Sequence, residues 1–319
     1  MKTVDKISII IPTFNRAHLI GETLESVIAQ TYPNWECLVV DDGSTDETES
    51  ILASYTFKDS RIKYFKRPKH LLKGANACRN FGFQLSTGAY INWFDDDDLM
   101  HEDKLSIQLQ KLQESEHHFS VCQTLVFENS PPTIIGLRSE QIYSSNVFYD
   151  YLSQNIVWMT PSALWKKSFL NTFDYLFDET LQAAQEWEFH CRVLLNCYKY
   201  DVVNEPLVYI RKHQNSISYN DNHKGRGFHY FLARLKVFKL ISNDEQLNEA
   251  TLFLKKYLLN SVKRIIRSRN LKDSMMIYRH LAKNNVLLNS KGKVAFFLSM
   301  LSFLVLGRGE FLFRYLSFK

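Results

Sequence analysis

The sequence has few cysteines, and its five cysteines show no paired C-x-x-C spacing. They lie inside apolar runs such as residues 37–40, where a reduced thiol acts as a small hydrophobic side chain. This pattern excludes a disulfide framework and a cysteine-ligated zinc site, and it favours a reducing compartment. We therefore expect a cytoplasmic location.

Long apolar runs are also missing. The longest apolar stretch, residues 294–306, has 13 residues, whereas a membrane-spanning helix needs roughly 18–20. The opening residues MKTVDK lead directly into a predicted strand, so we expect neither a signal peptide nor a membrane span. With 45% hydrophobic residues in a chain of 319, the composition excludes a disordered or collagen-like chain and allows one large or two medium domains.

Charge is distributed unevenly along the chain. Residues 1–224 hold 21 Lys and Arg against 29 Asp and Glu, a net charge of −8. Residues 225–319 hold 18 against 5, a net charge of +13, and the two values give the total of +5. This asymmetry predicts two regions with different partners. We place the boundary near residue 222, between a first domain (1–222) and a basic helical region (223–319).

Short apolar, β-branched runs alternate with helical periodicity in the first hundred residues. We expect strands at residues 7–11, 37–40, 62–65 and 90–94, and helices at 17–30, 44–55 and 75–85. The second helix would begin at a capping box formed by Ser44 and Glu47. Strands separated by helices predict an α/β fold, with a mostly parallel central sheet and helices on both faces.

Beyond residue 100 the pattern is less regular. It predicts strands at 119–127 and 162–165, extended segments at 202–203 and 207–210, and helices at 141–152 and 183–195. From about residue 227 the sequence is helical almost throughout, with basic residues between apolar ones.

Polar residues follow three of the predicted strands, at the sheet edge where open parallel sheets bind ligands. PTFNR (12–16) follows the first strand, Asp41 and Asp42 follow the second, and DDDD (95–98) follows the fourth. The sequence lacks a G-x-G-x-x-G fingerprint and a Walker GxxxxGK[ST] motif. The phosphates of a bound nucleotide would therefore need another counter-charge, and a divalent cation on the aspartates would supply it.

Adjacent carboxylates repel one another, and burial raises their pKa unless a cation compensates. Carboxylate oxygens are ligands that Mg²⁺ and Mn²⁺ prefer. The alternative is a solvated acidic turn that caps a helix beginning near His101. Asp41 and Asp42 could likewise be a plain turn, with Gly43 at positive φ. A carboxylate there could also accept a hydrogen bond from a pyrimidine imide or a ribose hydroxyl.

Six segments in order resemble family 2 glycosyltransferases with the GT-A fold, the inverting nucleotide-sugar transferases of polysaccharide and lipopolysaccharide assembly. Within residues 6–220 they read ISIIIPTFNR, VVDDGSTDET, GANACRNFGF, GAYINWFDDDD, QEWEFHCR and YIRKHQNSIS. The resemblance implies a Rossmann-like GT-A domain with a nucleotide-binding half (1–100) and an acceptor half (101–222), followed by a C-terminal helical region.

The resemblance also implies roles for individual residues. The nucleotide-sugar site would contain Pro12, Thr13, Asn15, Asp41, Asp42, Lys73, Arg79, Asn80, Asp95, Asp96 and Arg211. Within it, Asp41 would accept from the imide of uracil or another base, and Asp96 would lie near the ribose or the sugar. Asp95 and Asp97 match the outer members of the family's D-x-D motif. The ligands of Mn²⁺ or Mg²⁺ would be Asp97, Asp95 and His213, with Asp97 the first choice.

Simpler interpretations stay open for two of these residues. Arg79 could be a surface residue of its helix, and His213 could be an ordinary hydrogen-bonded histidine.

An inverting transfer needs a general base that takes the proton of the acceptor hydroxyl. Family members usually place an Asp, often after a Glu, at the start of a helix; here Glu186 and Gln185 stand at these positions. The extra methylene moves the carboxylate by about 1 Å, a displacement that matters in catalysis. Glu188 is the second choice for the base, and a helix-surface glutamate is the alternative for Glu186.

The basic region interleaves cations with apolar residues, as in KRIIRSR (263–269). This pattern favours peripheral contact with the cytoplasmic face of a membrane over nucleic-acid binding, and no nucleic acid is expected as a partner. Helices packed on the catalytic domain or in an oligomer are the alternative. The expected partners are a nucleotide-sugar donor, UDP-linked, and a saccharide or lipid-linked acceptor.

Two other functions stay open. A nucleotidyltransferase has related topology but normally carries a glycine-rich basic loop where this chain has PTFNR. A non-catalytic protein that binds membrane surfaces or nucleic acid would need only the basic region.

Overall fold

The computed structural model describes residues 5–128, 133–212, 226–284 and 288–316. The chain divides into two compact units. Met1–Thr180 and Phe189–Asn220 make up the first, called here the sheet unit. Leu181–Glu188 and Asp221–Lys319 make up the second, the helical unit. The domain boundary near residue 222 stays a prediction.

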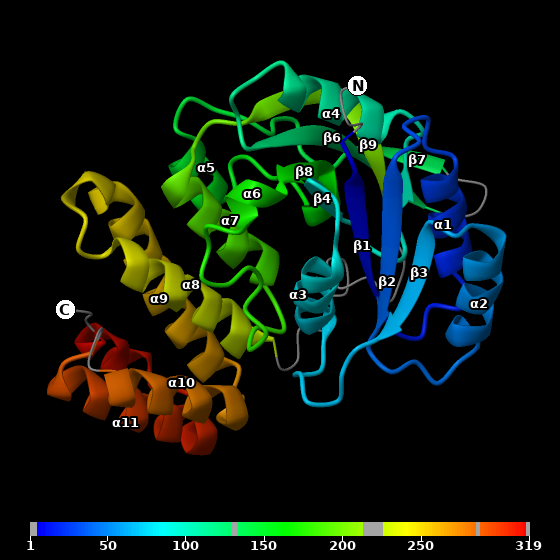
Figure 1. The fold of residues 1–319 in the computed structure, drawn as a ribbon. Helices are drawn as coiled ribbons and strands as arrows, with labels where there is room; N and C mark the ends of the chain where they lie inside the picture. The colour runs from blue at the N-terminus through cyan, green and yellow to red at the C-terminus, as the bar shows by residue number, and fades with distance from the viewer. Residues whose placement is uncertain (1–4, 129–132, 213–225, 285–287, 317–319) are drawn as a thin grey trace. The chain divides into compact units, whose positions relative to one another are not determined.

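A nine-stranded mixed sheet is the framework of the sheet unit (Figure 1). Its order is β3-β2-β1-β4-β8-β6-β9-β5, and β7 pairs with β6 beside this path. The strands are β1 Ile7–Thr13, β2 Trp35–Asp41, β3 Ile62–Lys66, β4 Tyr90–Trp93, β5 Leu99–Met100, β6 Phe119–Glu128, β7 Thr133–Leu137, β8 Ala163–Lys166 and β9 Asp201–Arg211.

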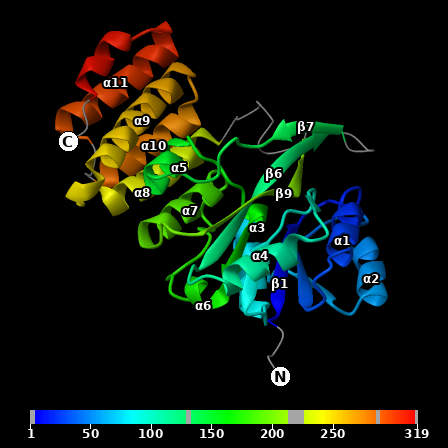
Figure 2. The same cartoon turned by 90° about the horizontal axis from the view of Figure 1, so that it is seen from above.

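The sheet has a parallel half and a mixed half. β1, β2, β3 and β4 are all parallel, whereas β8 is antiparallel to both of its neighbours, β4 and β6. β9 runs parallel to β6, and Figure 2 shows the two long strands side by side, with β7 next to them. The α/β class expected from the sequence is confirmed.

Helices cover both faces of the parallel half. Figure 1 shows α1 (Ile20–Ile28) and α2 (Thr48–Lys58) on one side of β1 and β2, and α3 (Ala75–Leu85) on the other. Successive side chains of a strand point to opposite faces, so Ile9 joins the buried cluster of Leu24 in α1 while Ile10 faces α3. A Cβ at Gly82 would overlap the Ile10 side chain, so this glycine permits the close approach of α3.

The remaining short elements connect the strands. They are α4 Lys104–Gln113, α5 Val147–Ser153, the 3-10 turn η1 Thr160–Ser162, α6 Lys167–Leu170 and α7 Gln185–Asn196. The helix expected at 141–152 is therefore confined to its second half.

The helix expected from Ser44 begins later, at Thr48, so the capping-box prediction is wrong. The Ser44 hydroxyl is already used, because it accepts from the Asn15 N–H (2.8 Å) and donates to Asp41 Oδ1 (2.7 Å). Asp46 instead accepts from the Thr48 N–H through Oδ1 (3.1 Å). The Ser44 hydroxyl is thus bonded to the loop that follows β1, whereas the local sequence pattern predicts that it caps the helix.

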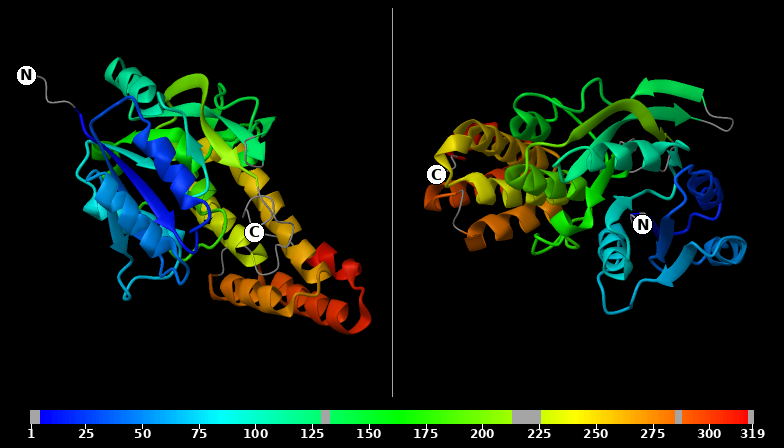
Figure 3. Two further views of the ribbon diagram at one scale, coloured as in Figure 1. Left: turned by 90° about the vertical axis from the view of Figure 1, so that its right-hand side faces the viewer. Right: turned by 45° about the horizontal axis from the view of Figure 1, so that its top comes forward.

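The described residues of the helical unit form mainly four helices, drawn in yellow to red in Figure 3. They are α8 Gly227–Ile241, α9 Asn248–Arg267, α10 Leu271–Asn284 and α11 Ser290–Leu306, with 3-10 turns η2 Glu245–Leu247 and η3 Glu310–Tyr315. The helical character expected after residue 227 is confirmed. Within the residues that the structure describes, none of these helices is both long and apolar enough to cross a bilayer.

Candidate functional site

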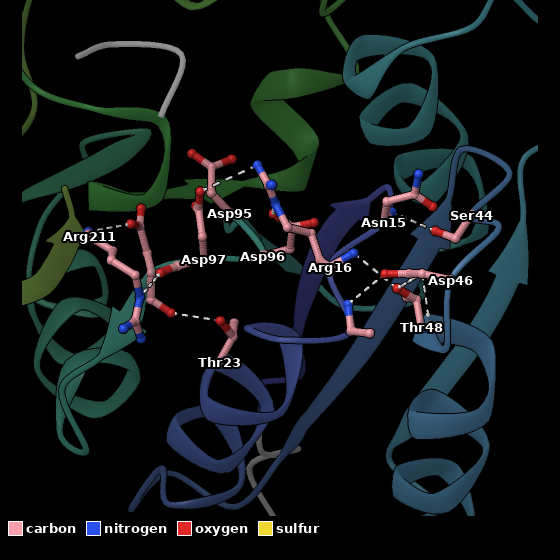
Figure 4. Close-up of polar contacts among 12 residues, drawn as sticks. Asn15, Arg16, Thr23, Ser44, Asp46, Thr48, Asp95, Asp96, Asp97 and Arg211 are labelled. Atoms are coloured by element: carbon pink, nitrogen blue, oxygen red, sulfur yellow. Dashed lines mark hydrogen bonds and ion pairs between the residues drawn. The ribbon is translucent and has the colours of Figure 1, made fainter. Parts of the chain in front are cut away.

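The site lies at the carboxyl ends of β1, β2 and β4 in the sheet unit, where an open parallel sheet binds ligands. The register brings these ends together, because Thr13 pairs with Asp41 across β1 and β2, and Ile10 pairs with Trp93 across β1 and β4. The four aspartates 95–98 follow β4 after one residue, Phe94, and are called here the acidic loop. Figure 4 shows this loop facing the residues that follow β1.

The aspartates of the acidic loop differ in exposure. The side chains of Asp95 and Asp97 are 30% and 19% exposed, whereas Asp96 and Asp98 are buried. The outer residues of the D-x-D pattern are therefore the two that reach the surface of the loop.

Burial and mutual repulsion act on the inner carboxyls. Burial, together with the neighbouring charge of Asp97, raises the pKa of Asp96 to about 7. The same two causes raise the pKa of Asp98, although the backbone N–H of Arg211 donates to its Oδ1 at 2.9 Å. A cation bound at the loop would relieve this repulsion.

Two arginines pair with the acidic loop. Arg79 of α3 donates from Nη2 to Asp95 Oδ1 at 2.7 Å, and its side chain is 8% exposed. Arg16, from the loop after β1, donates from Nε to Asp96 Oδ1 at 3.2 Å, and its Nη2 lies 3.7 Å from Asp97 Oδ2 (Figure 4). The interpretation of Arg79 as a solvated surface residue is therefore wrong.

Arg211, at the end of β9, braces the acidic loop from another direction. Its Nε donates to the Asp97 carbonyl oxygen (2.9 Å), and its Nη2 donates to Glu22 Oε2 of α1 (2.7 Å). The guanidinium also lies 4.7 Å from the ring centre of Phe127. These contacts are those of a positioning residue. The predicted contact of Arg211 with the nucleotide sugar stays a prediction.

Both oxygens of Asp41 have protein partners. Oδ1 accepts from the N–H of Gly43 (3.1 Å) and from the N–H (2.8 Å) and hydroxyl (2.7 Å) of Ser44, while Oδ2 accepts from the Tyr64 hydroxyl (2.9 Å). These bonds hold the turn in which Gly43 takes a φ of +94°. A carboxylate has about four acceptor positions, so room for a base contact is left chiefly on Oδ2.

The neighbouring residues of the predicted base pocket also shape the loops. Asp42 pairs with Arg67, from the segment after β3. Asn15 has a left-handed backbone (φ 53°), and its Oδ1 accepts from the Thr45 N–H at 2.8 Å. Pro12 and Thr13 are buried in β1. Their predicted contacts with the base stay predictions.

The other residues predicted to bind the nucleotide sugar lie on α3 and in the segment that precedes it. Lys73 Nζ lies 4.4 Å from the ring centre of the exposed Phe14, at the rim of the same sheet edge. Asn80 Nδ2 donates to the Phe177 carbonyl (2.8 Å) and to Glu179 Oε1 (3.0 Å), so it fixes the segment that precedes α7.

The predicted base and its second choice lie in the first turn of α7. Glu186 is partly exposed, whereas Glu188 is fully buried. Exposure therefore favours Glu186 as the group that meets an acceptor. Next to it, Trp187 has the Arg234 guanidinium 4.1 Å from its ring centre, inside the helical unit. His213 lies outside the described residues.

Arg16 is missing from the residues predicted from the sequence. It belongs to the quoted PTFNR segment, and a cation in the loop opposite four acids was a signal that could have identified it. Glu22 carried no such signal, because its partner Arg211 is 189 positions away along the chain.

The described residues contain no preformed group of three or more His, Cys, Asp or Glu side chains that could hold a metal. The chemistry of the exposed donors still fits a hard divalent cation, since Mg²⁺ and similar ions are often held by one or two carboxylates plus water and substrate phosphates. Asp95 and Asp97 offer those two carboxylates.

Comparison with protein families matches residues 8–171 to the family described as "Glycosyl transferase family 2". The putative colanic acid biosynthesis glycosyl transferase WcaA of Escherichia coli is 31% identical over 77% of this chain and 88% of its own length. The E. coli enzyme WfgD, named as a UDP-Glc:alpha-D-GlcNAc-diphosphoundecaprenol beta-1,3-glucosyltransferase, is 30% identical over 54% of this chain and 64% of its own.

An uncharacterized glycosyltransferase of Rickettsia felis is 29% identical over 84% of this chain but only 43% of its own length. The chain thus spans less than half of the length of that relative.

Solved structures share the fold at low identity. S. aureus TarS (residues 1–349) in complex with UDP-GlcNAc has a TM-score of 0.63 at 19% identity, over 96% of this chain and 82% of its own. The mannosyltransferase PcManGT of Pyrobaculum calidifontis, in complex with GDP-Man and Mn²⁺, has a TM-score of 0.54 at 17% identity, over 97% and 89%. The family match, the long alignment with WcaA and the shared GT-A fold agree: the chain belongs to glycosyltransferase family 2.

Proposed function

We propose that this chain is an inverting, metal-dependent glycosyltransferase. It transfers a sugar from a nucleoside-diphosphate donor, UDP-linked, to a saccharide or lipid-linked acceptor in cell-surface polysaccharide assembly. The observation that carries the proposal is the exposure of Asp95 and Asp97 at the carboxyl end of β4, beside the loops that follow β1 and β2. The UDP-GlcNAc in the TarS structure supports a UDP-linked donor.

The donor side of the reaction depends on charge. Asp95 and Asp97 would hold Mn²⁺ or Mg²⁺, which supplies compensation for the negative charge that develops on the departing diphosphate. Lys73, at the rim, would add a cation for the phosphates. Arg16 and Arg79 keep the acidic loop in one arrangement before the donor arrives.

The acceptor side depends on one carboxylate. Glu186 would take the proton of the acceptor hydroxyl as its oxygen attacks the anomeric carbon. Attack from the face opposite the diphosphate inverts the configuration at that carbon. The partial exposure of Glu186 supports this role, and the burial of Glu188 argues against the second choice.

The acceptor class is proposed from the relatives. WfgD is named for an acceptor that carries diphosphoundecaprenol, and an acceptor of this class, presented at a membrane surface, suits a chain with a basic helical unit. Peripheral contact with the cytoplasmic face of the membrane is part of the same proposal.

The test combines donor binding with product analysis. Thermal unfolding is followed with UDP, GDP and their sugars, with and without Mn²⁺, in the wild-type protein and in Glu186→Gln. We expect a Mn²⁺-dependent rise in Tm with UDP ligands in both proteins, and transfer only in the wild type. NMR of the product should show the anomeric configuration opposite to that of the donor.

Two results would overturn the proposal. Retained configuration would exclude a single displacement, and full activity of Glu186→Gln would exclude the assigned base. Release of pyrophosphate from a nucleoside triphosphate would instead indicate a nucleotidyltransferase.

A further inference from the structure

Helix α11 (Ser290–Leu306) of the helical unit is apolar on two opposite sides. One stripe, which includes Phe296, Met300 and Phe303, is buried where α11 contacts α9, α10 and η3. This stripe packs α11 against the rest of the helical unit, and Phe297 adds a ring contact with Tyr278 of α10 (5.9 Å between ring centres).

A second apolar stripe of α11 is exposed. It is called here the outer stripe and consists of Val294 (58% exposed), Phe297 (40%), Leu298 (46%), Leu301 (41%) and Val305 (79%). Their spacing of three or four residues places them on one face of the helix. A surface helix normally carries polar residues on the face away from its core, and an exposed apolar patch of this kind marks an interaction surface.

Basic residues flank the outer stripe. Lys291 precedes it and Arg308 follows it, and both are exposed. The helix itself contains no Asp or Glu. The first acid after it, Glu310, is paired with Arg267 at 2.8 Å (Nε–Oε1). Apolar residues with cations at both ends, and no acid between them, match the surface of an anionic bilayer.

The length and packing of α11 decide its orientation in such a contact. A helix of 17 residues is about 25 Å long, and its buried stripe holds it against the helical unit along this length. The helix would therefore lie along a bilayer surface and expose only the outer stripe to lipid.

We propose that the outer stripe of α11 docks on an anionic phospholipid surface, with Val294–Val305 at the acyl boundary and the flanking cations at the lipid headgroups. A second copy of the chain is the less favoured occupant. Residues 225–319 carry a net charge of +13, so two such regions repel each other, whereas an anionic surface attracts each of them. This inference rests on the peripheral membrane contact in the proposed function, but it concerns binding alone and does not depend on the proposed transfer reaction.

The experiment measures cosedimentation of the full chain with vesicles. One set contains phosphatidylcholine only, and the other contains phosphatidylglycerol and phosphatidylcholine in equal parts. The test variant is Phe297→Gln/Leu301→Gln. The matched control is Leu240→Gln/Leu252→Gln, which removes two exposed leucines from α8 and α9 of the same unit. Circular dichroism verifies that each variant is folded.

We expect the wild type to bind the anionic vesicles more tightly than the neutral ones. The outer-stripe variant should lose about tenfold or more in partition onto anionic vesicles, and the control should bind as the wild type does. Equal binding of the outer-stripe variant and the wild type would overturn the proposal. So would a dimer, seen by analytical ultracentrifugation of the wild type without lipid, that the outer-stripe variant abolishes.

Discussion

The sheet unit and the helical unit use charge in opposite ways. Two of the arginines that contact the acidic loop are buried: the side chains of Arg79 and Arg211 are only 8% and 7% exposed. In the helical unit, many of the cations remain at the surface, as Lys256 and Arg264 do. Charge that orders a loop must be paired and shielded from water, whereas charge that attracts a partner must stay accessible. The net charge of a region therefore does not show which of these two roles its charged residues have. The exposure of the individual side chains does.

The largest expected effect concerns the accessible carboxylates of the sheet unit. Asp97→Asn removes a predicted metal ligand, so we expect transfer to fall by about 10³-fold or more, the scale of several kcal/mol of transition-state stabilisation by a metal. Initial rates at saturating Mn²⁺ measure the effect. The control, Asp174→Asn, changes an exposed aspartate of the same unit and should keep wild-type rates. Comparable rates in the two variants would contradict the assignment.

The next effect compares a buried with an exposed carboxylate. Glu36 is buried in β2 and accepts from Ser8 Oγ (2.8 Å), the Thr87 N–H (2.7 Å) and Lys63 Nζ (2.9 Å). We expect Glu36→Gln to lower the free energy of unfolding by about 3 kcal/mol, because it unpairs groups that lie at a buried site. Glu49→Gln, which breaks an exposed pair with Lys66, should cost under about 1 kcal/mol. Urea unfolding distinguishes the two, and equal costs would contradict the comparison.

The pH dependence of Glu36 follows from the same contacts. Burial alone would raise its pKa, but the hydrogen bonds from Thr87, Lys63 and Ser8 outweigh burial and leave the pKa of Glu36 lowered. The unfolded state therefore takes up a proton before the folded state does. The stabilisation is present above pH 4.5, the ordinary pKa, and is lost as the pH falls below it. Glu36→Gln should lose less stability than the wild type between pH 5 and about 3.

A smaller effect concerns a buried cation. Lys104 of α4 is fully buried, and its Nζ has no hydrogen-bond partner within the described part of the chain. Burial lowers the pKa of Lys104 to about 8. We expect Lys104→Met to raise the free energy of unfolding at pH 7 by about 2 kcal/mol, since it removes an unpaired buried charge.

The pH dependence of stability gives a second test of the Lys104 prediction. Between pH 8 and 10.5 the unfolded state holds more protons on Lys104 than the folded state does, so wild-type stability should gain a rising contribution across this window. Lys104→Met should lack that contribution. A variant less stable than the wild type at pH 7 would show that the ammonium group has a stabilising partner.

The smallest effect is expected in the helical unit. Arg264→Gln removes an exposed cation of α9, and we expect the free energy of unfolding to change by less than about 0.5 kcal/mol. A loss of unfolding free energy as large as that of Glu36→Gln would contradict the comparison of the two units, because the surface cations would then stabilise the fold. Thermal unfolding of both variants in the same buffer makes this test.

Much of the parallel half of the sheet could be predicted from the sequence. The apolar runs at 7–11 and 37–40 fall inside β1 and β2, and the acids after 94 stand where β4 ends. A strand buried on both faces reads as a continuous apolar run, and the carboxyl ends of parallel strands share one edge. Local pattern and topology therefore sufficed to place the acidic loop at a ligand-binding edge.

The pairings within the site could not be predicted in the same way. Arg16 and Asp96 are 80 positions apart, and Arg211 and Glu22 are 189 apart. No local periodicity reports such contacts, because they arise only when the sheet order is fixed. The capping box at Ser44 failed partly for this reason: the Ser44 hydroxyl accepts from the N–H of Asn15, 29 positions away, and donates to the nearby Asp41.

The hydrogen bonds of Glu36 also bear on how the parallel half of the sheet unfolds. One carboxylate in β2 joins Ser8 of β1, Lys63 of β3 and Thr87, which lies just before β4. Separating any one of these strands breaks a bond to the same group, so the four parallel strands should open together and not one by one. In native-state hydrogen exchange, the amides of β1, β2, β3 and β4 should therefore exchange through a single cooperative unit.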